Sequence, residues 1–145
     1  MSWLIHFTKI TSVSVVGMLI CHSTTCGAEE IFVCHESSFI FETYDEWDGY
    51  QKTSGTCRES PNQCHNHQNF ELKFAKAELK SSRFAYSGHW VNEYDDKTDR
   101  IIDVTISRLE GTFAEKDNLK LRSGFGYTKS TYLGTCELTD VQSKF

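Results

Sequence analysis

The chain has 145 residues, of which 20 are acidic and 15 basic, and its formal net charge is −5. This length suits one small domain. Nucleic acid and anionic membrane surfaces attract basic proteins, so we expect neither as a partner of this acidic chain.

The first 28 residues have the pattern of a signal peptide. The segment from Ile10 to Ile20 is apolar or small throughout, and it is too short to span a bilayer comfortably. Cys26 and Ala28 place small residues where a signal peptidase requires them for a cut after Ala28. We expect residues 1–28 to be removed, which leaves a single domain over residues 29–145 and no stable membrane insertion. A membrane anchor that stays on the mature protein is the alternative.

The mature chain contains four cysteines, Cys34, Cys57, Cys64 and Cys136. An even number in an exported chain favours two disulfides over free thiols. Three pairings exist, and connectivity does not follow from a sequence alone. Loop geometry leads us to favour Cys34–Cys136, which would join the first strand to the last and stabilise the fold by up to about 4 kcal/mol. Cys57–Cys64 would then close a short local loop.

Turn signals arrive along the mature chain about every ten residues, and runs rich in aromatic and β-branched residues lie between them. We expect strands at residues 31–35, 38–44, 69–76, 83–92, 101–107, 112–113, 119–122, 125–127 and 131–138. We expect polar turns or loops at residues 45–55, 57–68, 93–100 and 114–118. Residues 69–79 also contain good helix formers, so a short helix is the alternative there. About eight short strands with almost no helix predict an all-β fold, a small antiparallel β-sandwich or barrel stapled by disulfides.

The clearest strand signal lies in the segment from Ile101 to Phe113, which we expect to be the central hairpin. Ile102, Val104 and Ile106 alternate with polar residues, which predicts a strand with one buried face. Arg108 to Gly111 is the expected turn, because glycine readily takes a positive φ.

Two aromatic residues and one arginine are candidates for a binding surface. Trp47 and Tyr50 lie in an acidic, turn-rich segment, where exposed rings can form a platform for a sugar. The interpretation we favour has these rings folded back to cap a small core. Arg108 could bind a carboxylate ligand, although we favour a bond to carbonyls or an acidic neighbour that fixes the turn.

No catalytic motif and no metal site of common spacing occurs in the sequence, so we expect no cofactor. His89 stands beside Trp90 in a predicted strand and is expected to be partly buried. It would be the general base if the protein were a small hydrolase that also used carboxylates. A metal-binding protein that uses His35, His65 and His67 is a further alternative.

One stretch, Ile106-Ser107-Arg108-Leu109-Glu110-Gly111-Thr112-Phe113, is followed further along by Gly134-Thr135-Cys136. With an early cysteine, Cys34, these residues resemble a pattern in small exported bacterial proteins: signal peptide, Ile-x-Arg-x-x-Gly hairpin and Gly-x-Cys near the end. Such proteins are typically of unknown function, so the resemblance implies bacterial export and the Cys34–Cys136 pairing but no active site.

We therefore expect a non-enzymatic domain of the periplasm or cell exterior that binds an unknown protein or glycan partner.

Overall fold

The computed structural model describes residues 29–124 and 126–141, and the expected signal peptide at residues 1–28 lies outside this part of the chain. The described residues form eight antiparallel strands and two single-turn 3₁₀ helices. These elements are β1 (Glu29–Asp45), β2 (Gly49–Thr56), η1 (Pro61–Gln63), β3 (Glu71–Ala75), η2 (Lys76–Glu78), β4 (Lys80–Ser81), β5 (Ala85–Asp95), β6 (Thr98–Ser107), β7 (Thr112–Leu121) and β8 (Tyr127–Val141).

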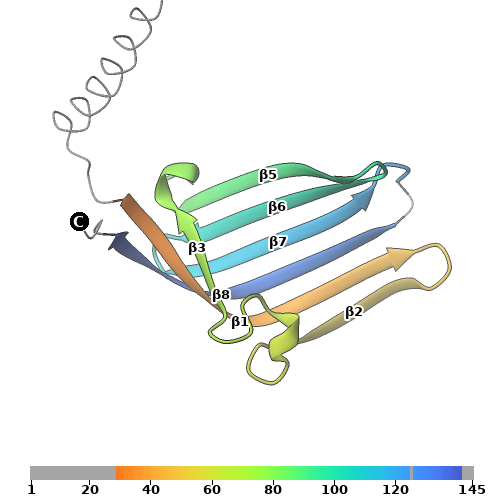
Figure 1. The fold of residues 1–145 in the computed structure, drawn as a ribbon, viewed down its shortest axis with the longest axis horizontal. Coiled ribbons are helices and arrows are strands. Elements are labelled where there is room, and N and C mark those ends of the chain that lie inside the picture. Colours follow the sequence, from red (N-terminus) through yellow and green to blue (C-terminus); the bar gives the residue numbers. More distant parts are fainter. Residues whose placement is uncertain (1–28, 125, 142–145) are drawn as a thin grey trace, which may run out of the picture. The chain divides into compact units, whose positions relative to one another are not determined.

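All eight strands belong to one sheet, in the order β2-β1-β8-β7-β6-β5-β4, and β3 also pairs with β1. After β3, the chain turns through η2 and pairs with β5 as β4. This run of chain crosses in front of the sheet at one end, as Figure 1 shows. The predicted all-β fold is confirmed, and a single sheet that is bridged at one end is closer to the predicted barrel than to the sandwich.

Strand β1 is one continuous strand where we expected two, because a β-bulge between Glu36 and Ser38 replaces the expected break. Its first half pairs with β3, and its second half pairs with β2 on the same side. The bulge bends the strand between these two partners. β1 therefore connects the bridged end of the sheet with the end where β2 forms the edge.

Two segments that we expected to be turns are strands. Residues 49–55 of the expected polar turn form most of β2, which is polar because it is an exposed edge strand. Residues 114–118, also expected to be a turn, lie in the middle of β7. For residues 69–79 the strand interpretation is confirmed over β3, and helix is limited to the single turn η2.

The main hydrophobic core lies at the bridged end of the sheet. Its buried members are Phe32, Cys34, Leu79, Val104, Ile106 and Phe113. Val104 and Ile106 are 1% exposed, as the alternation in the central hairpin predicts, and Gly111 closes the hairpin turn with φ +66°. Cys34 is joined to Cys136 and Cys57 to Cys64, the pairings that loop geometry favoured.

Gly88 allows this core to close. The indole of Trp90 and the side chain of Leu79 lie directly over it, and a Cβ at Gly88 would come within 2.2 Å of the Trp90 ring. A larger residue at position 88 would push Leu79, and the chain around it that crosses the sheet, away from β5.

Candidate ligand-binding cavity

The site lies on the inner face of the sheet, defined here as the face that carries Val104, Ile106 and Phe113. The segment from Cys57 to Leu79 covers one end of this face, and the other end is open (Figure 1). Side chains alternate between the two faces along each strand, so the register shows which residues the inner face presents.

A short disulfide loop is packed onto the covered part of the inner face. Cys57 and Cys64 are 1% and 4% exposed and lie against Phe39 of β1. The backbone N–H of Cys57 donates to the carbonyl of Ser37 at 2.9 Å, beside the bulge of β1. The loop is thereby held in a position that brings the next residue, His65, over the inner face.

His65 lies between two buried carboxylates. Its backbone N–H donates to Oε2 of Glu36 at 2.9 Å, and its ring Nδ1 bonds Oε1 of the same residue. Its Nε2 lies 3.9 Å from Oε1 of Glu115. The side chains of Glu36 and Glu115 are 0% and 8% exposed. An imidazolium ring at this place compensates for negative charge that burial would otherwise disfavour.

The surroundings shift the pKa values of this cluster. The hydrogen bond with Glu36 raises the pKa of His65, although burial opposes the change. Burial raises the pKa of Glu115, and the attraction of His65 works against that rise. A histidine that lies beside a buried carboxyl group, with both pKa values raised by the surroundings, is the kind of arrangement that acid–base chemistry uses.

An ion pair separates this cluster from the open part of the inner face. Nε of Arg100 donates to both carboxylate oxygens of Asp117, at 3.0 Å each. Asp117 is two residues beyond Glu115 on β7 and faces the same way. The pair satisfies both groups and leaves the guanidinium charge neutralised.

The metal alternative gains no support from the described part of the chain. The one group of three close ligand atoms found there is Glu36 with Cys57 and Cys64, whose sulfurs form a disulfide and so are not available as thiolates. His35 instead lies 3.6 Å from Glu71, and His67 Nδ1 lies 3.0 Å from the carbonyl of Pro61. The structure does not bring His35, His65 and His67 together as one ligand set.

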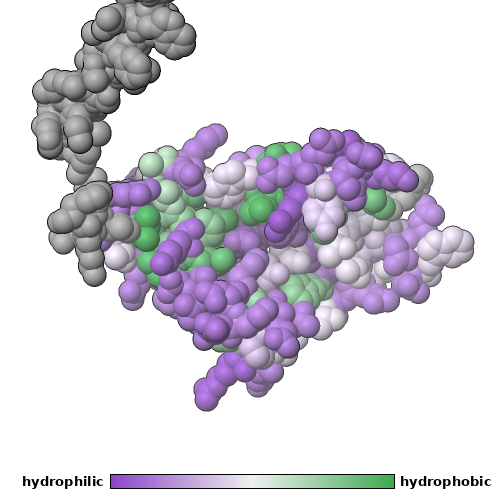
Figure 2. Space-filling view, viewed as in Figure 1, coloured by the Kyte–Doolittle hydropathy of each residue, from purple (hydrophilic) through white to green (hydrophobic). Residues whose placement is uncertain are grey.

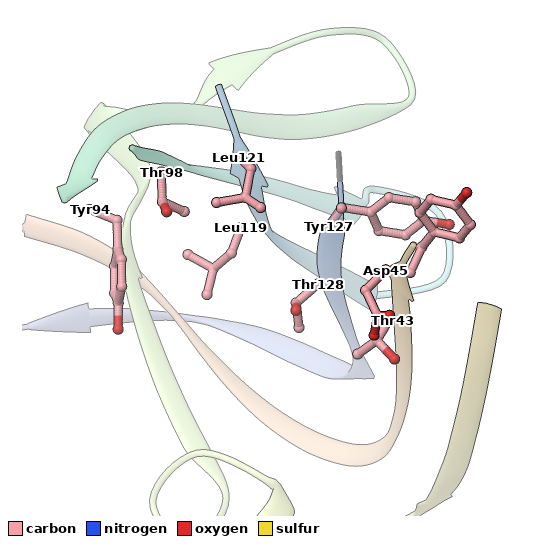
Figure 3. A pocket seen from close by; sticks show the side chains of 10 residues that line it. Thr43, Asp45, Tyr94, Thr98, Leu119, Leu121, Tyr127 and Thr128 are labelled. Atoms are coloured by element: carbon pink, nitrogen blue, oxygen red, sulfur yellow. The ribbon is translucent and has the colours of Figure 1, made fainter. Parts of the chain in front are cut away.

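The open end of the inner face contains a cavity of about 480 Å³, within the range of small-ligand sites. It is lined by Thr43, Tyr44, Asp45, Tyr94, Thr98, Leu119, Leu121, Gly126, Tyr127 and Thr128. Figure 3 shows Leu119 and Leu121 in the middle, Tyr94 on one side, and Thr43, Asp45 and Tyr127 on the other. The lining combines an apolar floor with threonine hydroxyls and one carboxylate, and it contains no lysine or arginine.

Trp47 and Tyr50 lie on the β1–β2 hairpin, which begins next to the lining residue Asp45. Trp47 is 92% exposed and Tyr50 52%, so the interpretation that they cap the core is wrong. The backbone N–H of Trp47 donates to Oδ1 of Asp45 at 2.8 Å, which fixes the hairpin tip beside the cavity. Tyr50 donates from its hydroxyl to Glu42 at 2.6 Å, and this bond raises the pKa of Tyr50 to about 12.

Arg108 lies at the other end of β6, away from Trp47 and Tyr50. Its Nη1 donates to the carbonyl of Ser82 at 2.7 Å, and its guanidinium lies 5.0 Å from the centre of the Tyr86 ring. These contacts tie the start of β5 to the hairpin turn. They match the role that we favoured for Arg108, which is to fix the hairpin turn by a bond to a carbonyl. That carbonyl belongs to the loop before β5.

His89 does not have the partial burial that we expected. Its side chain is 61% exposed and pairs with Asp103 at 2.5 Å. The physical reason is alternation along β5, because Gly88 and Trp90 take the inner face and leave His89 on the outer one.

The sequence analysis missed Glu36, Arg100, Glu115 and Asp117. A signal for two of them exists, because Glu115 and Asp117 continue the period-two pattern that starts at Phe113 and resumes at Leu119. Acidic residues at inward positions of a strand indicate a polar interior.

Among the residues that the structure describes, no helix is long and apolar enough to cross a membrane. Comparisons with protein-family models, with curated proteins and with solved structures find no match. The resemblance to small exported bacterial proteins therefore stays a prediction.

Figure 2 shows the view of Figure 1 as a surface, with hydrophobic residues gathered mainly at the bridged end and hydrophilic residues over most of the rest.

Proposed function

We propose that this protein is an exported, disulfide-stabilised domain that acts by binding a partner in the open cavity of its sheet, without catalysis. The two disulfides indicate an oxidising environment outside the cytoplasm. Export through a signal peptide at residues 1–28, to the periplasm or exterior of a bacterium, is part of the proposal.

The observation that carries the proposal is the cavity itself. Side chains from five strands line it, and its Leu119 and Leu121 floor lies beside hydroxyl and carboxylate groups that could orient a ligand. Such a combination of apolar surface with a few polar groups is typical of binding sites. The adjoining β1–β2 hairpin carries exposed Trp47, a residue type that often anchors interfaces, two residues beyond the lining residue Asp45.

The proposal can be tested by blocking the cavity. Thr128 is exposed, lines the cavity and lies on β8, so Thr128→Phe fills the space with a residue that suits a strand. Thr139→Phe is the matched control, because Thr139 is an exposed position further along β8 that does not line the cavity. The exported protein, labelled with ¹⁵N, is screened by NMR against small-molecule fragments, oligosaccharides and peptides.

We expect at least one probe to shift the amide signals of cavity residues in the parent protein and in Thr139→Phe but not in Thr128→Phe. Binding that persists unchanged in Thr128→Phe would place the site elsewhere. A screen in which no probe shifts cavity residues would overturn the proposal.

Export is tested separately by the intact mass of the protein recovered from the exporting cell. A mass that starts at Glu29, with no alkylation before reduction, is expected. A mass that keeps residues 1–28 would contradict removal of the signal peptide.

A small hydrolase is the second candidate, and the cluster of Glu36, His65 and Glu115 is the observation that favours it over a site at His89. Broad activity screening tests this candidate. Activity that vanishes in His65→Gln but persists in His67→Gln, with both variants folded, would establish it. Absence of activity in the parent protein would remove it.

A further inference from the structure

We infer that the occupant of the cavity is a basic peptide segment of a partner protein, whose Lys or Arg side chain enters between Tyr94 and Asp45. This inference rests on the proposed function and adds the chemical class of the partner.

The lining matches the two parts of a long basic side chain. Leu119 and Leu121 offer apolar surface to its methylene stem, and Asp45 offers a carboxylate to its charged end. Oδ1 of Asp45 accepts the backbone N–H groups of Trp47 and Asp48, at 2.8 and 2.7 Å. In the described part of the chain no hydrogen bond engages Oδ2, which is therefore free for a ligand.

Two arginines near the cavity are already neutralised by acidic partners. Arg100 lies beside Leu119 in the sheet, but its guanidinium is bonded to Asp117. Arg122 follows the end of β7 and is bonded to Glu93 at 2.7 Å and to Asp99 at 2.9 Å. Neither charge opposes the entry of a cation.

The two hairpins on either side of the cavity carry more acidic than basic residues. The hairpin that contains Asp45, Glu46 and Asp48 carries no basic residue between Tyr44 and Tyr50. The opposite hairpin, from Glu93 to Asp99, carries four acidic residues, of which Glu93 and Asp99 pair with Arg122, so Asp95 and Asp96 remain against one basic residue, Lys97. The cavity lies between them, because Asp45 lines one side and Tyr94 the other. Charges on both sides of the opening suit a segment with several basic residues better than a single small amine.

Exposed aromatic rings add a second attraction for cations. Tyr94 is 61% exposed and Trp47 92% exposed, and each lies within one of the two hairpins. A Lys or Arg side chain over such a ring gains a cation–π interaction. An acidic peptide would gain neither this contact nor an ion pair.

The test compares matched peptides on the ¹⁵N-labelled exported protein. One Gly/Ser peptide carries spaced lysines, a second carries glutamates at the same places, and the free polyamine spermine and a neutral oligosaccharide complete the set. We expect the lysine peptide to shift cavity amide signals, to bind more weakly as salt rises, and to bind more tightly than the other three probes.

Two variants test whether the negative charge of Asp45 contributes to binding of the lysine peptide. Asp45→Asn keeps an oxygen that accepts the backbone N–H groups of the hairpin tip but removes the negative charge. We expect it to weaken binding of the lysine peptide about fivefold, as for loss of one exposed ion pair. Glu110→Gln is the matched control, because it also removes one negative charge but lies in an exposed turn at the other end of β6. We expect no change in its affinity for the lysine peptide.

Each contrary result has a distinct meaning. If spermine binds at least as tightly as the lysine peptide, the inference that the occupant is a peptide is overturned, and a small polyamine is the occupant instead. Cavity binding of the glutamate peptide, of the oligosaccharide or of a fragment, without binding of the lysine peptide, would overturn the inference and leave the proposed function standing. Equal affinity of Asp45→Asn and the parent protein would also overturn it.

Discussion

His65 and Glu36 are 29 residues apart in the sequence, yet the ring and the backbone N–H of His65 both bond the carboxylate of Glu36. The contact connects the disulfide loop to β1 inside the sheet. On its other side the ring faces Glu115, 3.9 Å away. The ring and the backbone of His65 thus both help to hold the loop over the inner face.

The first prediction concerns the pH dependence of stability. The pKa of His65 in the folded protein is raised above its ordinary value of 6.5. A raised histidine pKa contributes stability that is fully present below pH 6.5 and is lost as pH rises through the folded pKa. We expect the free energy of unfolding, measured with urea, to fall as pH rises above 6.5. The fall should be smaller in His65→Gln, and an unchanged slope in that variant would contradict the assignment to His65.

The second prediction separates the two carboxylates that His65 touches. Glu36 is fully buried and bonded to His65, so Glu36→Gln should lower the free energy of unfolding by roughly 2 kcal/mol at pH 6. Glu115 is also buried, but burial disfavours its charged form and raises its pKa, so Glu115→Gln should cause no loss at pH 7. A raised carboxyl pKa makes the protein lose stability as pH rises above 4.5, and Glu115→Gln should remove that part of the pH dependence.

Urea denaturation of both variants from pH 4 to pH 8 measures these effects. Equal losses in the two variants at pH 7 would mean that Glu36 and Glu115 play the same structural part.

The sequence allowed the central hairpin to be predicted because its signal is local. Val104 and Ile106 alternate with polar residues, and the Gly111 turn follows directly. The strand character of β7 around Glu115 was not predictable in the same way. A run of polar residues is typical of a turn, and here the polar side chains face inward because partners from distant segments receive them.

The candidate site was harder to predict than the fold. The partner of Asp117 is Arg100 on the neighbouring strand, and the partner of Glu36 lies on a disulfide loop. Such contacts depend on strand register and on how the sheet bends, which composition does not reveal. Trp47 was identified as an aromatic candidate, but its exposure follows from the position of the hairpin tip beyond the sheet.

The third prediction compares the two disulfides. The Cys34–Cys136 bond spans a sequence separation of 102 and the Cys57–Cys64 bond a separation of 7. In the chain-entropy model the long bond stabilises the fold by roughly 2 kcal/mol more than the short bond. Replacing both members of the long bond by alanine should therefore lower the free energy of unfolding more than the same change in the short bond.

The short bond has a second expected effect that the long one lacks. Without Cys57–Cys64 the loop no longer holds His65 at Glu36, so the fall in stability above pH 6.5 should become smaller in that double variant and stay unchanged in the variant without the long bond. A pH dependence that survives loss of the short bond unchanged would show that the backbone contacts of the loop position His65 by themselves.

The fourth prediction concerns Arg108, whose guanidinium bonds the carbonyl of Ser82 and lies over the ring of Tyr86. Arg108→Gln should lower the free energy of unfolding by about 1 kcal/mol, because the charge-assisted hydrogen bonds to Ser81 and Ser82 and one cation–π contact are lost. Arg108→Lys keeps the positive charge but not the fork of donors, so its loss should be smaller. Arg108 lies at the other end of β6 from the cavity, and affinity for the lysine peptide should stay unchanged in both variants. Weaker binding without a loss of stability would instead make Arg108 part of the binding surface.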